Sequence, residues 1–160
     1  MQSVNECFDN VKEDYLKFLN KEKIFGKSKA EKITSLKKMK KLTCHCGGVE
    51  AEVKLPEKGF EKLVRCNCSI CKRKGYIMTP VSPENFKLIK GQDLLTLYQY
   101  HTKVAEHYFC SKCGIYTHTN PRSNHDKVYM INVGCVEGVK PLELKNIIVS
   151  DGENHPLDKK

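Results

Sequence analysis

The chain has 160 residues, of which 39% are hydrophobic and 29% are charged, and its formal net charge is +9. These values are typical of one globular domain with an appendage. No apolar run approaches the roughly 20 residues that a membrane-spanning helix needs, so we expect no membrane partner. There is no tryptophan and little aromatic mass, so the hydrophobic core should be small and something besides burial should help to hold the fold.

Nine cysteines are present, which in a secreted chain of this size would indicate disulfides. No apolar run follows the first Met, so we expect no signal peptide and a reducing environment. The predicted location is intracellular and cytoplasmic, with a nuclear location also open. In such a compartment, tight cysteine spacing indicates metal binding.

Two helices are predicted before residue 42. The first spans residues 8–19, where apolar residues recur at helical spacing. These residues are Phe8, Val11, Tyr15, Phe18 and Leu19. Gly26 then interrupts the pattern, and Ser28 with Glu31 fits a capping box that would start a second helix. The apolar face of the second helix would carry Ile33, Leu36 and Met39.

The first 41 residues are rich in lysine and hold +5 of the net charge. Nine lysines lie between Lys21 and Lys41, with no arginine. Such a run is typical of a solvated helical face, and it could also bind nucleic acid or another acidic partner. We therefore treat residues 1–41 as a Lys-rich helical extension.

From Leu42 onward, short alternating runs broken by Gly, Pro and Asn indicate a mainly β domain made of two small antiparallel sheets. Val49, Ala51 and Val53 alternate with charged residues. Further predicted strands are Leu63–Cys66, Tyr76–Val81, Phe86–Ile89, Leu94–Tyr100, Val104–Phe109, Val128–Val133 and Ile147–Val149. This domain is predicted to span residues 42–150, and the polar residues 151–160 should form a loose tail.

Four cysteines form two short pairs, each followed by glycine. Cys110-Ser-Lys-Cys113-Gly has the form of a zinc knuckle, and Cys44-His-Cys46-Gly-Gly offers a second pair with similar turn chemistry. Four thiolates complete a tetrahedron around zinc and leave no open position. We therefore predict a structural zinc site whose binding energy contributes to folding.

Three further cysteines, Cys66, Cys68 and Cys71, lie within six residues and cannot complete a tetrahedron alone. Catalytic zinc usually keeps three protein ligands and leaves the fourth position to water or substrate. An all-thiolate site would favour a thiol there. The alternative is that a histidine closes the site and makes it structural, with His101, His107 and His118 as candidates.

Other residues near these motifs allow two interpretations each. The run Lys72-Arg73-Lys74 could offset thiolate charge or simply be solvated. Arg122 could bind a substrate carboxylate or belong to a surface turn. His101, His107 and His118 are also candidate general acids or bases on residue type alone. His45 is expected to point outward, and Cys7 and Cys135 to be ordinary thiols.

The cysteine motifs resemble those of the glutathione-dependent formaldehyde-activating enzymes and their eukaryotic relatives grouped with centromere protein V. The resemblance covers about Leu42 to Val149. It rests on the motifs Cys44-His-Cys46-Gly-Gly, Cys66-Asn-Cys68-Ser-Ile-Cys71, His-Tyr-Phe-Cys110-Ser-Lys-Cys113-Gly and Pro121-Arg122-Ser123-Asn124.

The resemblance implies a β-tent fold with two zinc ions per chain. Its structural zinc would be held by Cys44, Cys46, Cys110 and Cys113, and its catalytic zinc by Cys66, Cys68 and Cys71. It also implies carbon–sulfur lyase chemistry, such as the formation of S-hydroxymethylglutathione from glutathione and formaldehyde.

A rival hypothesis is a non-catalytic zinc module that binds chromatin or another acidic partner through Lys21–Lys41. The absence of arginine from this segment argues against base readout, while non-specific attraction to phosphate stays open. Thiol redox work by three unmetallated cysteines is a weaker third option.

Overall fold

The structure is a computed structural model that describes residues 37–158. The first predicted helix, most of the second and Cys7 lie outside the described residues. Met39 lies in strand β1 (Lys37–Thr43), so the second predicted helix does not include it. The described residues contain no helix that is long and apolar enough to cross a membrane.

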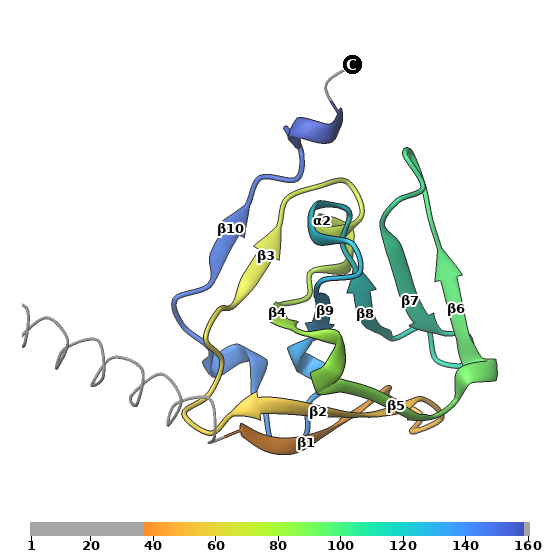
Figure 1. Ribbon diagram of the computed structural model, residues 1–160, viewed down its shortest axis with the longest axis vertical. Helices are drawn as coiled ribbons and strands as arrows, with labels where there is room; N and C mark the ends of the chain where they lie inside the picture. The colour runs from red at the N-terminus through yellow and green to blue at the C-terminus, as the bar shows by residue number, and fades with distance from the viewer. Residues whose placement is uncertain (1–36, 159–160) are drawn as a thin grey trace, which may run out of the picture. The chain divides into compact units, whose positions relative to one another are not determined.

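The described chain is mainly β, as predicted, and forms two sheets (Figure 1). The smaller sheet has the strand order β1-β2-β5, in which β2 is Glu50–Pro56 and β5 is Phe86–Lys90. The larger sheet has seven strands in the order β10-β3-β4-β9-β8-β7-β6. These strands are β3 (Val64–Cys66), β4 (Met78–Val81), β6 (Leu95–Tyr98), β7 (Glu106–Cys110), β8 (Tyr116–Asn120), β9 (Tyr129–Asn132) and β10 (Ile148–Ser150).

Helical structure in the described residues is limited to single turns. The α-helix α2 spans Cys71–Lys74 and ends at Gly75, which adopts a left-handed conformation with φ 64°. The 3-10 turns are η1 (Pro83–Asn85), η2 (Gln92–Leu94), η3 (Arg122–Asn124), η4 (Val133–Cys135), η5 (Pro141–Glu143) and η6 (Pro156–Asp158).

Two features of the larger sheet differ from the sequence prediction. Strand β10 pairs with β3 in parallel, with Ile148 opposite Val64, so the sheets are not purely antiparallel. Strand β8 was not predicted, because its sequence Tyr-Thr-His-Thr-Asn shows no apolar pattern. Yet all five of its residues are buried, since β7 and β9 flank it and side chains cover both faces. Hydrogen bonds offset the cost of removing these polar side chains from water, since no buried side-chain nitrogen or oxygen of the described residues lacks a partner.

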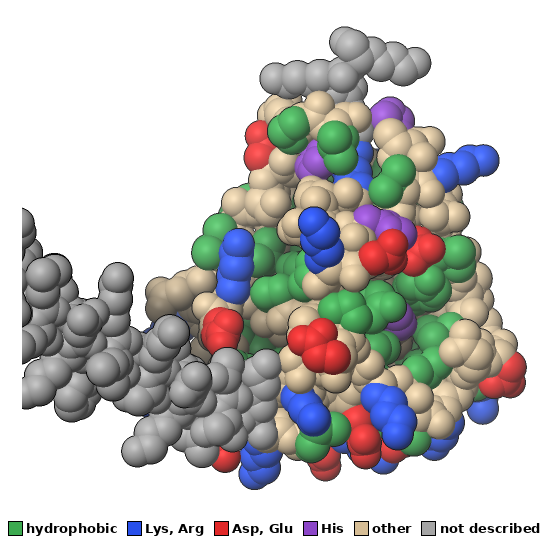
Figure 2. All heavy atoms as spheres, viewed as in Figure 1, with side chains coloured by type: hydrophobic (Ala, Val, Ile, Leu, Met, Phe, Trp, Pro, Cys, Tyr) green, Lys and Arg blue, Asp and Glu red, His purple; other side chains and the backbone are tan. Residues whose placement is uncertain are grey.

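The core lies between the two sheets. Leu42 and Val53 of the smaller sheet are fully buried against Val81 and Ile131 of the larger one. Strand β2 alternates buried and exposed residues as its sequence predicts, and its exposed side carries charge. Figure 2 shows basic and acidic side chains interspersed along the bottom of the molecule in this view. Lys41 and Lys90 each pair with Glu50, at 2.9 and 3.6 Å.

Strand β1 begins at Lys37 and crosses the boundary predicted at residue 42. The division of the chain into extension and domain stays a prediction, but the structure indicates where a truncation should be placed. We expect removal of residues 1–35 to leave a cooperatively folding domain. Removal of 1–43 deletes β1 and the buried Leu42, and loss of a buried leucine alone costs about 2–5 kcal/mol.

Thermal unfolding followed by circular dichroism separates the two truncations. The shorter deletion should melt within a few degrees of the full chain, and the longer one should melt far lower or fail to fold. Precipitation of the shorter deletion would show that residues 1–35 are required by the domain.

Candidate metal centres and substrate cavity

The first cysteine cluster joins the two sheets. Cys44 follows β1 of the smaller sheet, and Cys110 ends β7 of the larger one. All four sulfurs of the cluster lie within 4.8 Å of one another, as predicted from their spacing. Cys44 and Cys110 are 2% and 0% exposed. The cluster comprises Cys44, Cys46, Cys110 and Cys113.

Backbone turns position these four sulfurs. Gly47 and Gly114 follow the two pairs with φ of 68° and 71°, a left-handed conformation that glycine adopts without strain. The amide of Gly114 donates to the Cys110 carbonyl at 2.8 Å, and the amide of Val49 donates to Cys44 Sγ at 3.2 Å. Amide donors of this kind stabilise a thiolate.

The geometry of the four-cysteine cluster fits a tetrahedral metal ion. Bonds of about 2.3 Å from zinc to sulfur require sulfur–sulfur distances of about 3.8 Å. The Sγ atoms of Cys44 and Cys46 lie 3.5 Å apart, and those of Cys46 and Cys110 lie 3.7 Å apart. Four sulfurs at this spacing could hold a metal ion with no further ligand.

The second cluster lies on one short segment between β3 and α2. Cys66 ends β3, Cys68 lies in the following loop and Cys71 begins α2. Their sulfurs also lie within 4.8 Å of one another, and no histidine of the described residues joins the group. The structure therefore does not support the alternative in which a histidine closes this cluster. The three sulfurs could hold a metal ion whose remaining position is not filled by a described residue.

Two tyrosines contact the second cluster. Tyr100 Oη donates to Cys68 Sγ at 3.8 Å, and Tyr76 Oη lies 3.6 Å from Cys71 Sγ. Hydrogen bonds from Cys66 and Cys71 lower the pKa of the Cys68 thiol, while the contacts with Cys66 and Cys68, together with burial, raise the pKa of Cys71.

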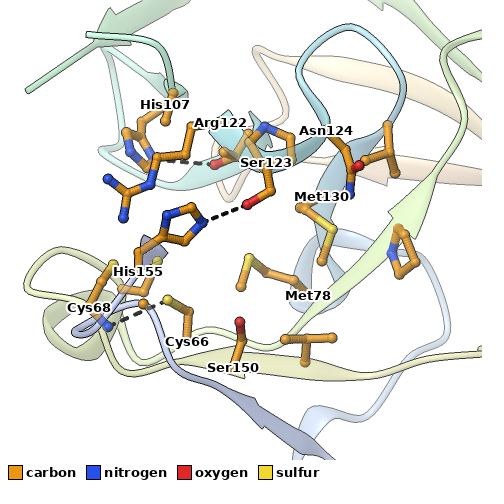
Figure 3. Close-up of a pocket in the computed structure, with 18 of the residues that line it drawn as sticks. Cys66, Cys68, Met78, His107, Arg122, Ser123, Asn124, Met130, Ser150 and His155 are labelled. Atoms are coloured by element: carbon orange, nitrogen blue, oxygen red, sulfur yellow. Dashed lines mark hydrogen bonds between the residues drawn. The ribbon is translucent and has the colours of Figure 1, made fainter. Parts of the chain in front are cut away.

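A cavity of about 630 Å³ opens over the three-cysteine cluster (Figure 3). All three cysteines line it, and so do the cationic residues Lys62, Arg122 and Lys127. No aspartate or glutamate of the described chain is among its lining residues. The four-cysteine cluster does not line this cavity. The structure thus separates a closed cluster from one that faces a cavity suited to an anionic ligand.

The three candidate histidines lie in different surroundings. His101 and His107 line the cavity, whereas His118 does not. His118 is buried on the other face of β8, where its ring stacks on Tyr108 at 4.6 Å. The general acid or base role considered for His118 therefore has no support from its position.

His107 is held at the cavity wall by neighbouring side chains. Its Nδ1 lies 2.7 Å from Tyr116 Oη and 3.3 Å from Thr119 Oγ1, and its ring stacks on that of Tyr100. Burial, helped by the charge of Lys74, lowers the pKa of His107 to about 4. His107 is therefore neutral at pH 7 and can accept or donate hydrogen bonds there.

The basic run after Cys71 does not line the cavity. Lys72 pairs with Glu153 at 3.4 Å, and Arg73 hydrogen-bonds the carbonyl of Ser69. Lys74 Nζ lies 3.6 Å from the centre of the Tyr116 ring, and burial lowers the pKa of Lys74 to about 8. The run therefore makes local contacts, and the charge of the nearby Cys71 only partly offsets the effect of burial on the pKa of Lys74.

His45 is exposed, as expected. Cys135 is buried, belongs to neither cluster and donates from Sγ to the Tyr116 carbonyl at 3.5 Å, in agreement with its prediction as an ordinary thiol.

The C-terminal segment forms a part of the cavity wall that was not predicted from the sequence. Ser150, Gly152 and His155 all line the cavity, although residues 151–160 were expected to be a loose tail. No local signal marks these residues, because their contacts are with Asn67 and Ser123, far away in the sequence.

Comparison with known proteins agrees with this geometry. A solved crystal structure of a Rhodobacter sphaeroides protein is 44% identical, with a TM-score of 0.64, and the match covers 69% of this chain and 99% of that one. The family described as glutathione-dependent formaldehyde-activating enzyme matches residues 39–148, a region that contains both cysteine clusters. The chain therefore belongs to the family of glutathione-dependent formaldehyde-activating enzymes.

Proposed function

We propose that this protein is a zinc-dependent carbon–sulfur lyase that makes or breaks the thiol adduct of a small carbonyl compound. The expected example is the formation of S-hydroxymethylglutathione from glutathione and formaldehyde. The observation that carries the proposal is the placement of Cys66, Cys68 and Cys71 at the wall of a cavity of about 630 Å³. We further propose two zinc ions per chain, a structural one in the four-cysteine cluster and a catalytic one here.

A zinc ion bound by these three cysteines would take the substrate sulfur as its fourth ligand, lower the pKa of the thiol and fix the position of the sulfur. Two tyrosine side chains of the protein lie next to the cysteines that would bind this zinc ion. The hydroxyl groups of Tyr76 and Tyr100 contact the ligand sulfurs, and burial raises the pKa of Tyr100 to about 12. Burial raises the pKa of Tyr76 as well, so both tyrosines stay neutral and can donate hydrogen bonds to thiolate sulfurs.

The lining charges favour glutathione among thiols. Glutathione carries two carboxylates and one ammonium group, and its size suits a cavity of several hundred cubic ångströms. Lys62, Arg122 and Lys127 supply cations along the wall. A guanidinium such as that of Arg122 can bind a carboxylate through two parallel hydrogen bonds.

In the proposed reaction, the thiolate sulfur attacks the carbonyl carbon and forms the carbon–sulfur bond. The π electrons move to the carbonyl oxygen, which then takes a proton from water. His107 is neutral at pH 7, so it does not donate a proton to the substrate as an imidazolium. Its role in the proposal is to hold the ring of Tyr100 in place by stacking on it. His101 also lines the cavity.

The first test concerns the four-cysteine cluster. We expect Cys110→Ser to lower the melting temperature by more than about 10 °C, because zinc bound between the two sheets contributes folding free energy. Differential scanning calorimetry measures the effect. The matched control is Cys135→Ser, which removes another buried sulfur outside both clusters. Equal melting temperatures for the two variants would contradict a structural role.

The second test concerns the open cluster. Cys68→Ser should leave the melting temperature within a few degrees of wild type, while adduct formation above the uncatalysed rate falls by at least roughly 100-fold. Elemental analysis should find two zinc ions in the wild type and fewer in the variant. An undiminished rate in Cys68→Ser would overturn the enzyme proposal and leave the non-catalytic zinc module.

The third test concerns substrate charge. Lys62→Glu should weaken glutathione binding about threefold to tenfold at low salt and leave binding of uncharged 2-mercaptoethanol unchanged. Lys54→Glu is the control, since Lys54 is an exposed lysine of β2 that does not line the cavity. Isothermal titration calorimetry gives both affinities. An equal loss for both thiols would argue against recognition of the glutathione carboxylates by this wall.

A further inference from the structure

The C-terminal segment Asp151–Leu157 lies beyond the residues that match the family, yet it packs on the three-cysteine cluster. Gly152 is buried, and a Cβ atom placed on it would lie 2.8 Å from Cys68 Cβ and would also collide with Cys66 Sγ. Only a residue without a side chain can bring the backbone this close. The segment is therefore part of the site's wall.

Asn67, between two of the cysteines, fastens this segment. Its Oδ1 accepts hydrogen bonds from the amides of Gly152 and Glu153 at 2.7 and 2.9 Å, and its Nδ2 donates to Asp151 Oδ1 at 3.1 Å. The Asp151 carboxylate in turn accepts from the amide of Asn154 at 3.1 Å. These bonds couple the position of the segment to the loop that carries Cys66 and Cys68.

The segment also brings His155 to the cavity, where its ring lies between Ser123 and the cysteines (Figure 3). His155 Nδ1 accepts a hydrogen bond from the Leu157 amide at 3.2 Å, and its Nε2 lies 2.7 Å from Ser123 Oγ. An amide can only donate, so Nδ1 must be unprotonated and the proton of the neutral ring must be on Nε2. His155 Nε2 therefore donates to Ser123 Oγ.

This direction of donation sets the role of Ser123. Its oxygen accepts from His155, so its own hydroxyl hydrogen is left to donate to a third group, and Ser123 lines the cavity. Each donor in the series Leu157, His155 and Ser123 polarises the next one. The series therefore ends in a hydroxyl donor that faces the cavity containing the three cysteines.

We propose that Ser123 donates a hydrogen bond to the oxygen of the carbonyl substrate, and that His155 is the positioning residue that orients Ser123. The proposal rests on the proposed function, in which the substrate sulfur lies at the three-cysteine cluster. As the carbon–sulfur bond forms, the carbonyl oxygen gains negative charge and Ser123 stabilises it. The proton that completes the hydroxymethyl group comes from water, so Ser123 and His155 keep their own protons.

The experiment measures adduct formation from glutathione and formaldehyde by exchange NMR, with glutathione affinity measured in parallel by calorimetry. Ser123→Ala should lower the catalysed rate about tenfold, the factor expected for one hydrogen bond, and leave glutathione affinity unchanged. His155 has two informative replacements. His155→Gln can still donate to Ser123, whereas His155→Asn keeps an acceptor near the Leu157 amide and cannot reach Ser123.

We expect His155→Gln to keep most of the wild-type rate and His155→Asn to match Ser123→Ala. The double variant of Ser123→Ala with His155→Asn should be no slower than either single variant, because both remove the same interaction. Independent, multiplying losses would overturn the link between the two residues, and a wild-type rate in Ser123→Ala would overturn its role as donor. A wild-type protein that binds glutathione without accelerating adduct formation would instead overturn the proposed function.

Discussion

Four sulfur atoms from two different sheets meet at one point of the described fold, and the structural role that we propose for them rests on this junction. Cys44 and Cys46 follow a strand of the smaller sheet. Cys110 ends a strand of the larger sheet and Cys113 lies in the turn after it, and the four sulfurs lie within 4.8 Å of one another. The apolar core between the sheets is small and contains no tryptophan. A metal ion at this junction would supply the stability that so small a core lacks, which is why we assign the cluster a structural role.

The two clusters use the same ligand type, and their surroundings separate their proposed roles. The first cluster is complete within itself and lies away from the cavity. The second has three sulfurs on one short segment and lines a cavity whose charged wall residues, among those described, are all cations. Because zinc chemistry on a substrate needs an open position, only the second cluster suits a reaction. The family match is consistent with this division, and the specific lyase reaction remains our proposal.

The hydrogen-bonding groups near the second cluster come from widely separated parts of the chain. Tyr76 and Tyr100 contact its sulfurs, whereas His155 reaches the cavity on a segment fastened by Asn67. In the proposed reaction, the substrate sulfur and the carbonyl oxygen would thus lie near residues from different segments of the chain. In the proposed reaction, different parts of the chain would therefore contact the thiol and the carbonyl compound, and the C-terminal part lies outside the region matched to the family.

The sequence by itself determined the mainly β architecture and the division of seven cysteines into four and three. Both are local properties: strand alternation has a period of two residues, and metal-binding pairs such as Cys110 and Cys113 share one turn. Only the tertiary structure decided the rest. Strand β8 is polar and is recognisable only once its neighbours bury it, and β10 joins β3 in parallel across a long connection. His155 lines the cavity and His118 does not, because residues far apart in the chain pack against each other. No local sequence pattern encodes such contacts.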